Sequence, residues 1–386
     1  MELKQCWRRA AIRFSRAGVF AQPFRELWRG RLALLLVGSL VACGVRAGES
    51  VQIPAIRAGL ASKALLTDSA HLSDRVVAVG AYGDIVWSRD GKTWSQANVP
   101  SQVLLTTVFF VDDREGWAAG HDALILHTTD GGENWTIQHE DPVPGGDLPK
   151  PILDIYFADK LHGWAVGAFS LLLTTEDGGA HWQTVGTSRL AAQLEAADQE
   201  SEPNFNALLP VEDGFIIAGE LGTLLHFDPK ASAAGGGVAD EAADEAEDAA
   251  DAGDAAGTAA ANPGNSPWRI IKSPYRGSFF GIRRLSSGDL FIYGLRGHMF
   301  KSGDRGNTWI PIDTNGVTNN LNDIIEMDNG DAVIVGSGGT LLRLPAGSLT
   351  VKRIPYPGFN GFMSVQKLGT DALLLFGDAG AQVFQF

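Results

Sequence analysis

The stretch TTDGGENW at Thr128–Trp135 decides the fold, because it recurs along the chain. Near-copies are SRDGKTW at Ser88–Trp94, TTEDGGAHW at Thr174–Trp182 and SGDRGNTW at Ser302–Trp309. Each copy holds a Ser or Thr, then Asp, Gly and Trp at nearly constant intervals. An Asp carboxylate accepts backbone N–H bonds in a tight turn, and Gly tolerates positive φ. Four copies therefore predict an internal repeat whose units close with the same turn.

A second pattern precedes these turns, in which short apolar runs flank a glycine. It reads GWAAGHDALILHTTDGG from Gly116 and GWAVGAFSLLLTTEDGG from Gly163. The shared glycine marks seven units and stands at Gly80, Gly120, Gly167, Gly219, Gly294, Gly336 and Gly377. Short apolar and β-branched runs between Gly turns indicate strands, about four in each unit. The chain is therefore predicted to be all-β, with residues 48–386 forming a single seven-bladed β-propeller.

The two ends of the propeller predict how the ring closes. The seventh unit stops at Phe386 with three strands, and VQIPAI at Val51–Ile56 is a spare strand ahead of the first unit. Unpaired strand edges promote aggregation, so natural sheets cover them. We expect the N-terminal strand to pair with the last blade and close the ring.

Residues 1–47 have the pattern of an export signal. Many basic residues precede the apolar run LALLLVGSLVAC at residues 32–43, which is too short to span a bilayer. Two cleavage sites remain open: after Ala47, or at the lipobox-like LVAC, which would leave a lipidated Cys43. The sequence thus predicts a periplasmic or equivalent lumenal location, with Cys43 as the only route to membrane anchoring. Only Cys6 and Cys43 exist, so a propeller cleaved after Ala47 has no cysteine for a disulfide, a zinc site or catalysis.

The charge is acidic, and much of it is concentrated in one segment. The formal net charge is −14, which argues against a nucleic-acid or anionic-membrane binder. Residues 229–265, within the fourth unit, are rich in Ala, Gly and acidic residues, a composition that predicts a disordered insertion. A metal-binding loop is the alternative, but the acids lack EF-hand spacing. We expect no metal and no cofactor.

The pattern [S/T]-x-D-x-G-x-x-W resembles the Asp-box, or BNR repeat, which would lie between the third and fourth strands of a blade. The Asp would cap the turn and the Trp would cover it, so these residues are predicted to be structural. They are Asp90, Trp94, Asp130, Trp135, Asp177, Trp182, Asp304 and Trp309. The fourth and sixth units lack the motif.

An exported seven-bladed propeller with repeated GWAVG…DGG…W resembles the photosystem II stability/assembly factor-like family over residues 51–386. The resemblance implies a non-catalytic assembly factor or scaffold whose protein partner is a membrane complex or its subunits. We expect the protein to be a monomer. In photosynthetic organisms that complex is photosystem II, whereas similar proteins of other bacteria must have a different partner. The acidic insertion and the two missing boxes depart from the family pattern.

Asp-boxes also occur in sialidases, so a sialidase-like glycoside hydrolase or a carbohydrate-binding propeller is the alternative function. Sialidase chemistry needs an arginine triad, a Tyr nucleophile with its Glu, and an Asp acid/base. The RIP motif at Arg353–Pro355 follows the last box, whereas in sialidases it precedes the first one. None of the five tyrosines has a recognisable nucleophile context. These departures favour a protein that is not an enzyme.

Small polar residues stand thirteen positions before most repeat glycines, where each innermost strand should begin. The set, which we expect to ring one mouth of the central channel, is Thr67, Thr107, Asp154, Asn206, Gly281, Asp323 and Ser364. Two interpretations remain open: the side chains cap backbone groups, or they contact a ligand, ions or water. The Asp-box turns should emerge on the opposite face.

Basic residues are concentrated between Arg269 and Arg305 in an otherwise acidic chain. Arginine pairs bidentately with carboxylate, so this region could dock an acidic protein partner. The sequence predicts that Arg283, Arg284 and Arg296 lie on or near one surface and contribute to this docking. Scattered solvated charge, or a patch covered by the acidic insertion, are the alternatives.

Overall fold

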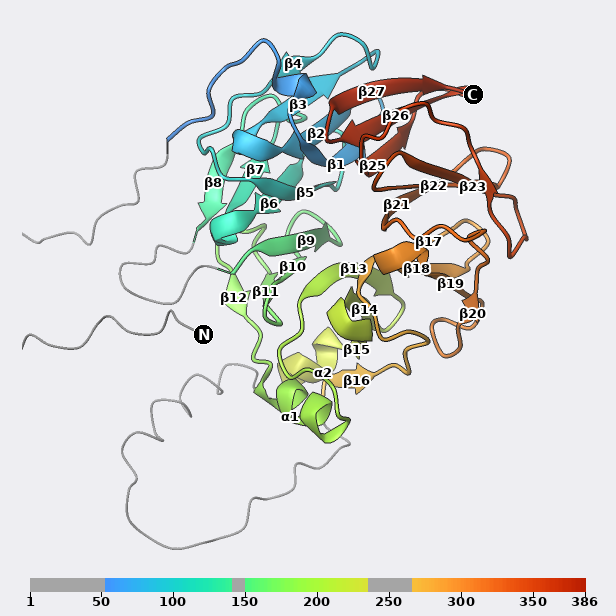
Figure 1. Ribbon diagram of the computed structural model, residues 1–386. Coiled ribbons are helices and arrows are strands. Elements are labelled where there is room, and N and C mark those ends of the chain that lie inside the picture. Colours follow the sequence, from blue (N-terminus) through green and yellow to red (C-terminus); the bar gives the residue numbers. More distant parts are fainter. Residues whose placement is uncertain (1–52, 141–149, 235–265) are drawn as a thin grey trace, which may run out of the picture. The chain divides into compact units, whose positions relative to one another are not determined.

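The computed structural model describes residues 53–140, 150–234 and 266–386, which belong to one compact unit, Glu49–Phe386 (Figure 1). Within them, 27 strands form seven antiparallel sheets, of which six have four strands and one has three. This arrangement confirms the all-β seven-bladed β-propeller. The predicted export signal lies outside the described residues, as does the predicted insertion apart from its first six residues, which form helix α2 (Pro229–Ala234).

The first four blades carry most of the repeat turns. Blade one contains β1 (Leu66–His71), β2 (Val76–Gly80), β3 (Ile85–Ser88) and β4 (Ser95–Gln96). Blade two contains β5 (Leu105–Phe110), β6 (Gly116–Gly120), β7 (Ile125–Thr128) and β8 (Thr136–His139). Blade three contains β9 (Ile152–Phe157), β10 (Gly163–Gly167), β11 (Leu172–Thr175) and β12 (Gln183–Thr184). Blade four contains β13 (Phe205–Val211), β14 (Gly214–Gly219), β15 (Leu224–Phe227) and β16 (Trp268–Ile270).

The last three blades follow the same order, and blade seven ends after its third strand. Blade five contains β17 (Phe279–Arg284), β18 (Leu290–Gly294), β19 (Met299–Ser302) and β20 (Ile310–Pro311). Blade six contains β21 (Leu321–Glu326), β22 (Ala332–Gly336), β23 (Thr340–Leu344) and β24 (Lys352–Arg353). Blade seven contains β25 (Phe362–Lys367), β26 (Ala372–Gly377) and β27 (Gly380–Gln385).

Short helices complete the unit. Turns of 3₁₀ helix precede β1 and join second to third strands in several blades: η1 (Ala61–Lys63), η2 (Ala81–Gly83), η3 (His121–Ala123), η4 (Glu220–Gly222) and η6 (Leu295–Gly297). Helix α1 (Ser188–Ala196) links blades three and four. It buries Leu190 and Leu194 in the cluster shared by these two blades, beside Trp268 of β16. The helix thus supplies apolar contact at a blade that lacks an Asp-box.

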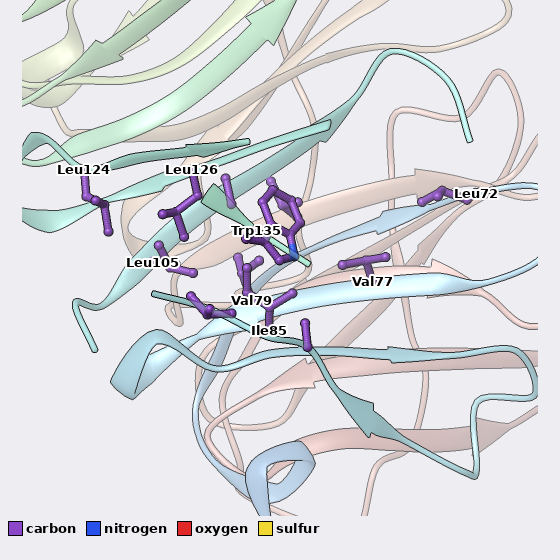
Figure 2. Packing of buried hydrophobic residues seen from close by; sticks show 12 residues of the cluster. Leu72, Val77, Val79, Ile85, Leu105, Leu124, Leu126 and Trp135 are labelled. Atoms are coloured by element: carbon purple, nitrogen blue, oxygen red, sulfur yellow. The ribbon is translucent and has the colours of Figure 1, made fainter. Parts of the chain in front are cut away.

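The core lies between the faces of neighbouring blades. The innermost strands contact one another in sequence around the ring, and β25 contacts β1. The second strands are central in each sheet and read as continuous apolar runs, because both of their faces are covered. Figure 2 shows one such core, where Val77 and Val79 of blade one meet Leu124, Leu126 and Trp135 of blade two. Packing of this kind stabilises each blade mainly through its neighbours.

The four Asp-box turns join third and fourth strands. Asp130 Oδ1 accepts bonds from the backbone N–H groups of Glu133 and Asn134, both at 3.0 Å, and from the Thr128 hydroxyl at 2.9 Å. Asp90, Asp177 and Asp304 accept the equivalent bonds. The indole of Trp135 is buried between blades one and two, and Trp94, Trp182 and Trp309 pack partly buried at the corresponding interfaces. The box therefore fastens each turn to the preceding blade.

The ring closes differently from the prediction. Residues 53–56 form no strand, and the Ala55 N–H donates to the Val99 carbonyl of blade one, so they run beside the first blade and not the last. Among the described residues, the last sheet keeps three strands. Pro54 has no N–H with which to extend a sheet edge. Blades one and seven are joined instead by side chains, including the edge of Trp94 against Phe376 at 5.9 Å.

Candidate functional site

Each innermost strand begins with a β-bulge or similar irregularity near its first residue, at the mouth of the central channel. In blade one the irregularity lies between Leu66 and Asp68, and in blade two between Leu105 and Thr107. Bulges redirect side chains and occur often beside functional sites. The residues at the equivalent position in the seven blades are Asp68, Thr107, Asp154, Ala207, Gly281, Asp323 and Ser364.

Two predicted ring members, Thr67 and Asn206, are one residue away from this position. In blades one and four the hairpin between first and second strands is one residue shorter, as the pairings Leu66 with Gly80 and Phe205 with Gly219 show. A constant count back from the glycine therefore misses Asp68. The length of the turn between the first and second strands identifies Asp68, because this turn is one residue shorter in blade one than in blade two.

Side chains one residue before the ring position form hydrogen bonds between neighbouring blades. The Thr67 hydroxyl donates to the Leu105 carbonyl at 2.6 Å, across the joint between blades one and two. Three further bonds of this kind run from Thr106 to the Ile152 carbonyl, from Asn206 to the Phe279 carbonyl, and from Asn322 to the Phe362 carbonyl, at 2.6, 2.7 and 2.7 Å. Thr67 and Asn206 thus cap backbone groups, which is one of the two interpretations of the predicted ring.

The carboxylates of Asp68, Asp154 and Asp323 form a second set of hydrogen bonds between neighbouring blades. Asp68 accepts a bond from its neighbour Ser69 N–H at 2.8 Å and another from Val108 N–H of the next blade at 2.9 Å. Asp154 does the same with Ile155 and Leu208, and Asp323 with Ile324 and Val365. Arg283 links blades five and six through Asp323 at 3.2 Å, and the Ser69 and Ser364 hydroxyls link blades one and seven at 2.7 Å. Hydrogen bonds therefore connect all seven joints of the ring.

These strands enclose a cavity of about 400 Å³ in the channel. Its walls carry the carboxylates of Asp68, Asp154 and Asp323, the guanidinium of Arg283 and the ring of Tyr293. Burial raises the pKa of Asp68 to about 7, against the bond from Val108, and the charges of Asp323 and Asp154 add to the rise. Burial likewise raises the pKa of Asp154 to about 6. The cavity wall therefore carries three carboxyl groups against one guanidinium, and burial disfavours the ionised form of two of them.

Tyr293 enters the channel from a second strand and replaces the missing side chain of Gly281. A Cβ at Gly281 would lie 2.3 Å from the Tyr293 hydroxyl, so any larger residue at the ring position of blade five would displace the Tyr293 ring. Tyr293 is only 3% exposed, and burial raises the pKa of its hydroxyl well above the ordinary value. The sequence alone does not place Tyr293 in the channel, because its position there depends on the register with the partner strand.

The channel does not assemble the sialidase constellation among the described residues. Arg283 is the single arginine on the cavity wall, where an arginine triad is needed, and no Glu lines it. A nucleophilic tyrosine requires activation by an adjacent base or a lowered pKa, whereas burial shifts the pKa of Tyr293 upwards. Arg353, in the RIP motif, belongs to the outer strand β24 and is not part of this wall.

The predicted basic surface of Arg283, Arg284 and Arg296 is wrong, because the structure separates the three side chains. Arg283 faces the channel, whereas its neighbour Arg284 donates to the Pro210 carbonyl and lines a different cavity. Successive side chains of a strand point to opposite faces. Arg284 pairs with Leu290 at the start of β18, and Arg296 follows the end of that strand, so about 15 Å of strand divides them.

A different basic group lies between blades four and five. A cleft of about 430 Å³ there is lined by Arg269 of β16, Arg284 of β17, and Arg305 of an Asp-box turn. Arg305 pairs with Glu212 at 2.9 Å. Within the described chain, Arg269 and Arg284 have no carboxylate within ion-pair distance. His226 also lines the cleft and is buried, with Nε2 3.1 Å from Asp213 Oδ1.

Two further properties of the described part of the chain bear on function. No cluster of three or more His, Cys, Asp or Glu side chains in it is placed to hold a metal ion. None of its helices is long and apolar enough to cross a membrane.

Comparison with known families and structures agrees with the predicted resemblance. The family model described as photosynthesis system II assembly factor YCF48 matches residues 64–150 and 143–233. The structure "YCF48 bound to D1 peptide" is 17% identical, covers 88% of this chain and 98% of its own, and has a TM-score of 0.57. "YCF48 from Cyanidioschyzon merolae" is 16% identical, with coverages of 83% and 95% and a TM-score of 0.59. These matches confirm the resemblance to the photosystem II assembly factor family.

The fold itself is more widely shared. The WD40 β-propeller domain of Doa1 is 12% identical, covers 87% of this chain and 96% of its own, and has a TM-score of 0.56. No curated protein sequence matches the chain. The solved structures therefore show the propeller architecture, and the repeat carries the family resemblance.

Proposed function

We propose that this photosystem II assembly factor-like β-propeller is a non-catalytic assembly factor or scaffold for a membrane-associated protein complex. The main support is its similarity in architecture to YCF48 bound to D1 peptide, a propeller seen with a segment of a protein partner. In a photosynthetic source the partner complex would be photosystem II. In a non-photosynthetic source the partner would be a different membrane complex, exposed on the side of the membrane to which the propeller is exported.

The channel chemistry favours binding over catalysis. Each of the three carboxylates there accepts two backbone N–H bonds, so its geometry is held by the fold. The one hydroxyl–carboxylate pair among the described cavity residues is long: the Thr107 hydroxyl lies 3.4 Å from Asp154 Oδ1. That carboxylate is already held by two backbone N–H bonds, and no third group orients the pair as an activated nucleophile requires. A rigid ring of this kind suits a scaffold that presents loops and clefts to a partner.

The cleft between blades four and five is the surface on which we place an acidic segment of the partner. Arg269 and Arg284 come from different blades and face one cavity. Neither makes an ion pair in the described chain, and Asp213 on the same wall interacts with Arg269 only at longer range. Guanidinium groups bind carboxylates through paired, charge-assisted hydrogen bonds. The rest of the protein is acidic, so an acidic segment would be attracted to this cleft and repelled elsewhere.

The test is affinity purification of the tagged protein from detergent-solubilised membranes of its source. We expect subunits of one membrane complex to be recovered. The Arg269→Ala/Arg284→Ala variant should bind them at least about thirtyfold more weakly, since truncating a docked charge costs roughly 2–5 kcal/mol. Arg296→Ala is the matched control, because it removes an exposed arginine at the other end of β18. Recovery of no complex subunit above the tag-only background would contradict the assembly role. Equal losses in both variants would contradict the cleft alone.

Export is part of the proposal and has a separate test. Mass spectrometry of the mature protein should find an N-terminus at a lipidated Cys43 or at Gly48. Export directed by the basic leader would place the propeller on the side of the membrane where the proposed partner is exposed, and the leader would then be removed. A chain that keeps residues 1–47 and fractionates with cytoplasmic proteins would refute it.

A further inference from the structure

The Tyr293 hydroxyl faces the channel cavity and makes no hydrogen bond to the described residues. The side chain is 97% buried and lines the channel cavity, where its oxygen lies above Gly281. A hydroxyl on a cavity wall can donate one hydrogen bond and accept two, so this group is available to whatever occupies the cavity. A partner that is not part of the described chain would satisfy it.

The charge around this hydroxyl is unbalanced. Three carboxylates from blades one, three and six face the cavity, and Arg283 pairs with only one of them, Asp323. Each oxygen of Asp68 accepts a single backbone hydrogen bond, so each retains a free lone pair. Asp68 and Asp154 therefore remain able to accept bonds from a positively charged group.

We propose that the channel cavity binds an organic cation through a primary ammonium or guanidinium group, which donates hydrogen bonds to the Tyr293 hydroxyl and the Asp68 carboxylate. The carboxylates are held apart on separate blades by their backbone bonds, and a cavity of about 400 Å³ has the size of a small-molecule site. An extended cation matches both facts better than a small ion does. The group comes either from a free polyamine or from a lysine or arginine side chain of a protein.

The alternative ligand for this cavity is an anion, and the arrangement of charged groups on the wall argues against anion binding. The Arg283 guanidinium is the single positive group on the wall, and it lies 3.2 Å from Asp323. Burial disfavours its charge, but the attraction of Asp323 and Asp68 outweighs burial and raises the pKa of Arg283. The positive charge of Arg283 is therefore already neutralised by its ion pair with Asp323.

The test is isothermal titration calorimetry of the mature protein with two probes, spermidine and a neutral-capped peptide containing one lysine. We expect at least one probe to bind, and Tyr293→Phe to weaken binding about tenfold while leaving the unfolding midpoint nearly unchanged, because the lost hydroxyl has no partner in the fold. Tyr356→Phe is the matched control. It loses a bond to Gln382 at 2.8 Å in blades six and seven, away from the cavity, and should bind as the wild type does.

Two further measurements make the proposal refutable. Asp68→Asn should weaken binding at least tenfold. Binding to the wild type should also strengthen from pH 5 to pH 8, as Asp68 and Asp154 ionise beside Asp323, Arg283 and Tyr293. Spermidine binding alone identifies a free polyamine, and peptide binding identifies a protein side chain. The absence of binding by both probes, unchanged affinity in both channel variants, or preferential binding of acetate would each overturn the proposal.

Discussion

Asp68 shows how a single carboxylate both joins two blades and adds charge to the channel. Its two backbone bonds stabilise the ionised form, yet burial has the larger effect and raises its pKa to about 7. Its surface stays partly open to the channel, so water screens part of this effect. Asp154 is arranged in the same way two blades further on.

The pH dependence of stability tests this residue. The folded-state pKa of Asp68 lies above its unfolded value, so the folded protein binds the proton more tightly. Stability from this group is complete below pH 4 and is lost as the pH rises towards 7. Urea unfolding at pH 5 and pH 8 should therefore show a smaller loss in Asp68→Asn than in the wild type, by on the order of 1–2 kcal/mol. Identical pH dependence in both proteins would refute the assignment.

At the scale of the element, the Asp-box turn acts on two blades. Asp130 closes the turn, and Trp135 then packs between blades one and two. The exposed turn at Asp159 accepts similar backbone bonds from Leu161 and His162 but carries no Trp. Hydrogen bonds led by the Thr308 side chain lower the pKa of Asp304 to about 2, so the box carboxylates stay ionised at neutral pH.

Comparing substitutions in the two turns distinguishes the stability gained by closing a hairpin from the stability gained by packing one blade against the next. Asp130→Ala should reduce the free energy of unfolding by about 2–3 kcal/mol, because it releases the turn and loosens the seat of Trp135. Asp159→Ala should cost about 1 kcal/mol or less. Urea denaturation followed by tryptophan fluorescence measures both. Equal losses would mean that the box closes its own turn and does nothing between the blades.

At the scale of the whole molecule, closure depends on side chains at the junction of blades one and seven. Leu66, Phe376 and Ala381 are buried together there, and Gln366 donates to the Ser69 carbonyl at 2.9 Å. The N-terminal segment contributes less, since Ile53 and Ile56 are 64% and 71% exposed. A propeller closed in this way gains its cooperativity from packed faces.

Truncation of the N-terminal segment should therefore destabilise the protein less than a core substitution at the closing interface. Deleting residues 53–56 should lower the free energy of unfolding by no more than about 1–2 kcal/mol and leave one cooperative transition. Phe376→Ala should cost about 3–5 kcal/mol, because it opens a cavity at the closing interface. Differential scanning calorimetry records both. A deletion more damaging than Phe376→Ala would restore the N-terminal strand as the closing element.

The number of blades, the four box turns and the likeness to assembly factors could be predicted from the sequence, because each depends on contiguous residues. Strand alternation and the Asp, Gly and Trp of a turn act within a few positions, so they survive without knowledge of the partner strand. Residues 53–56, the arginines and the channel could not be predicted in this way. One residue fewer in a hairpin moves Asp68 into the ring in place of Thr67, and alternation sends Arg283 and Arg284 to opposite faces. Tyr293 reaches the cavity only because the strand beside it carries Gly281, a match between two strands that tertiary pairing alone decides.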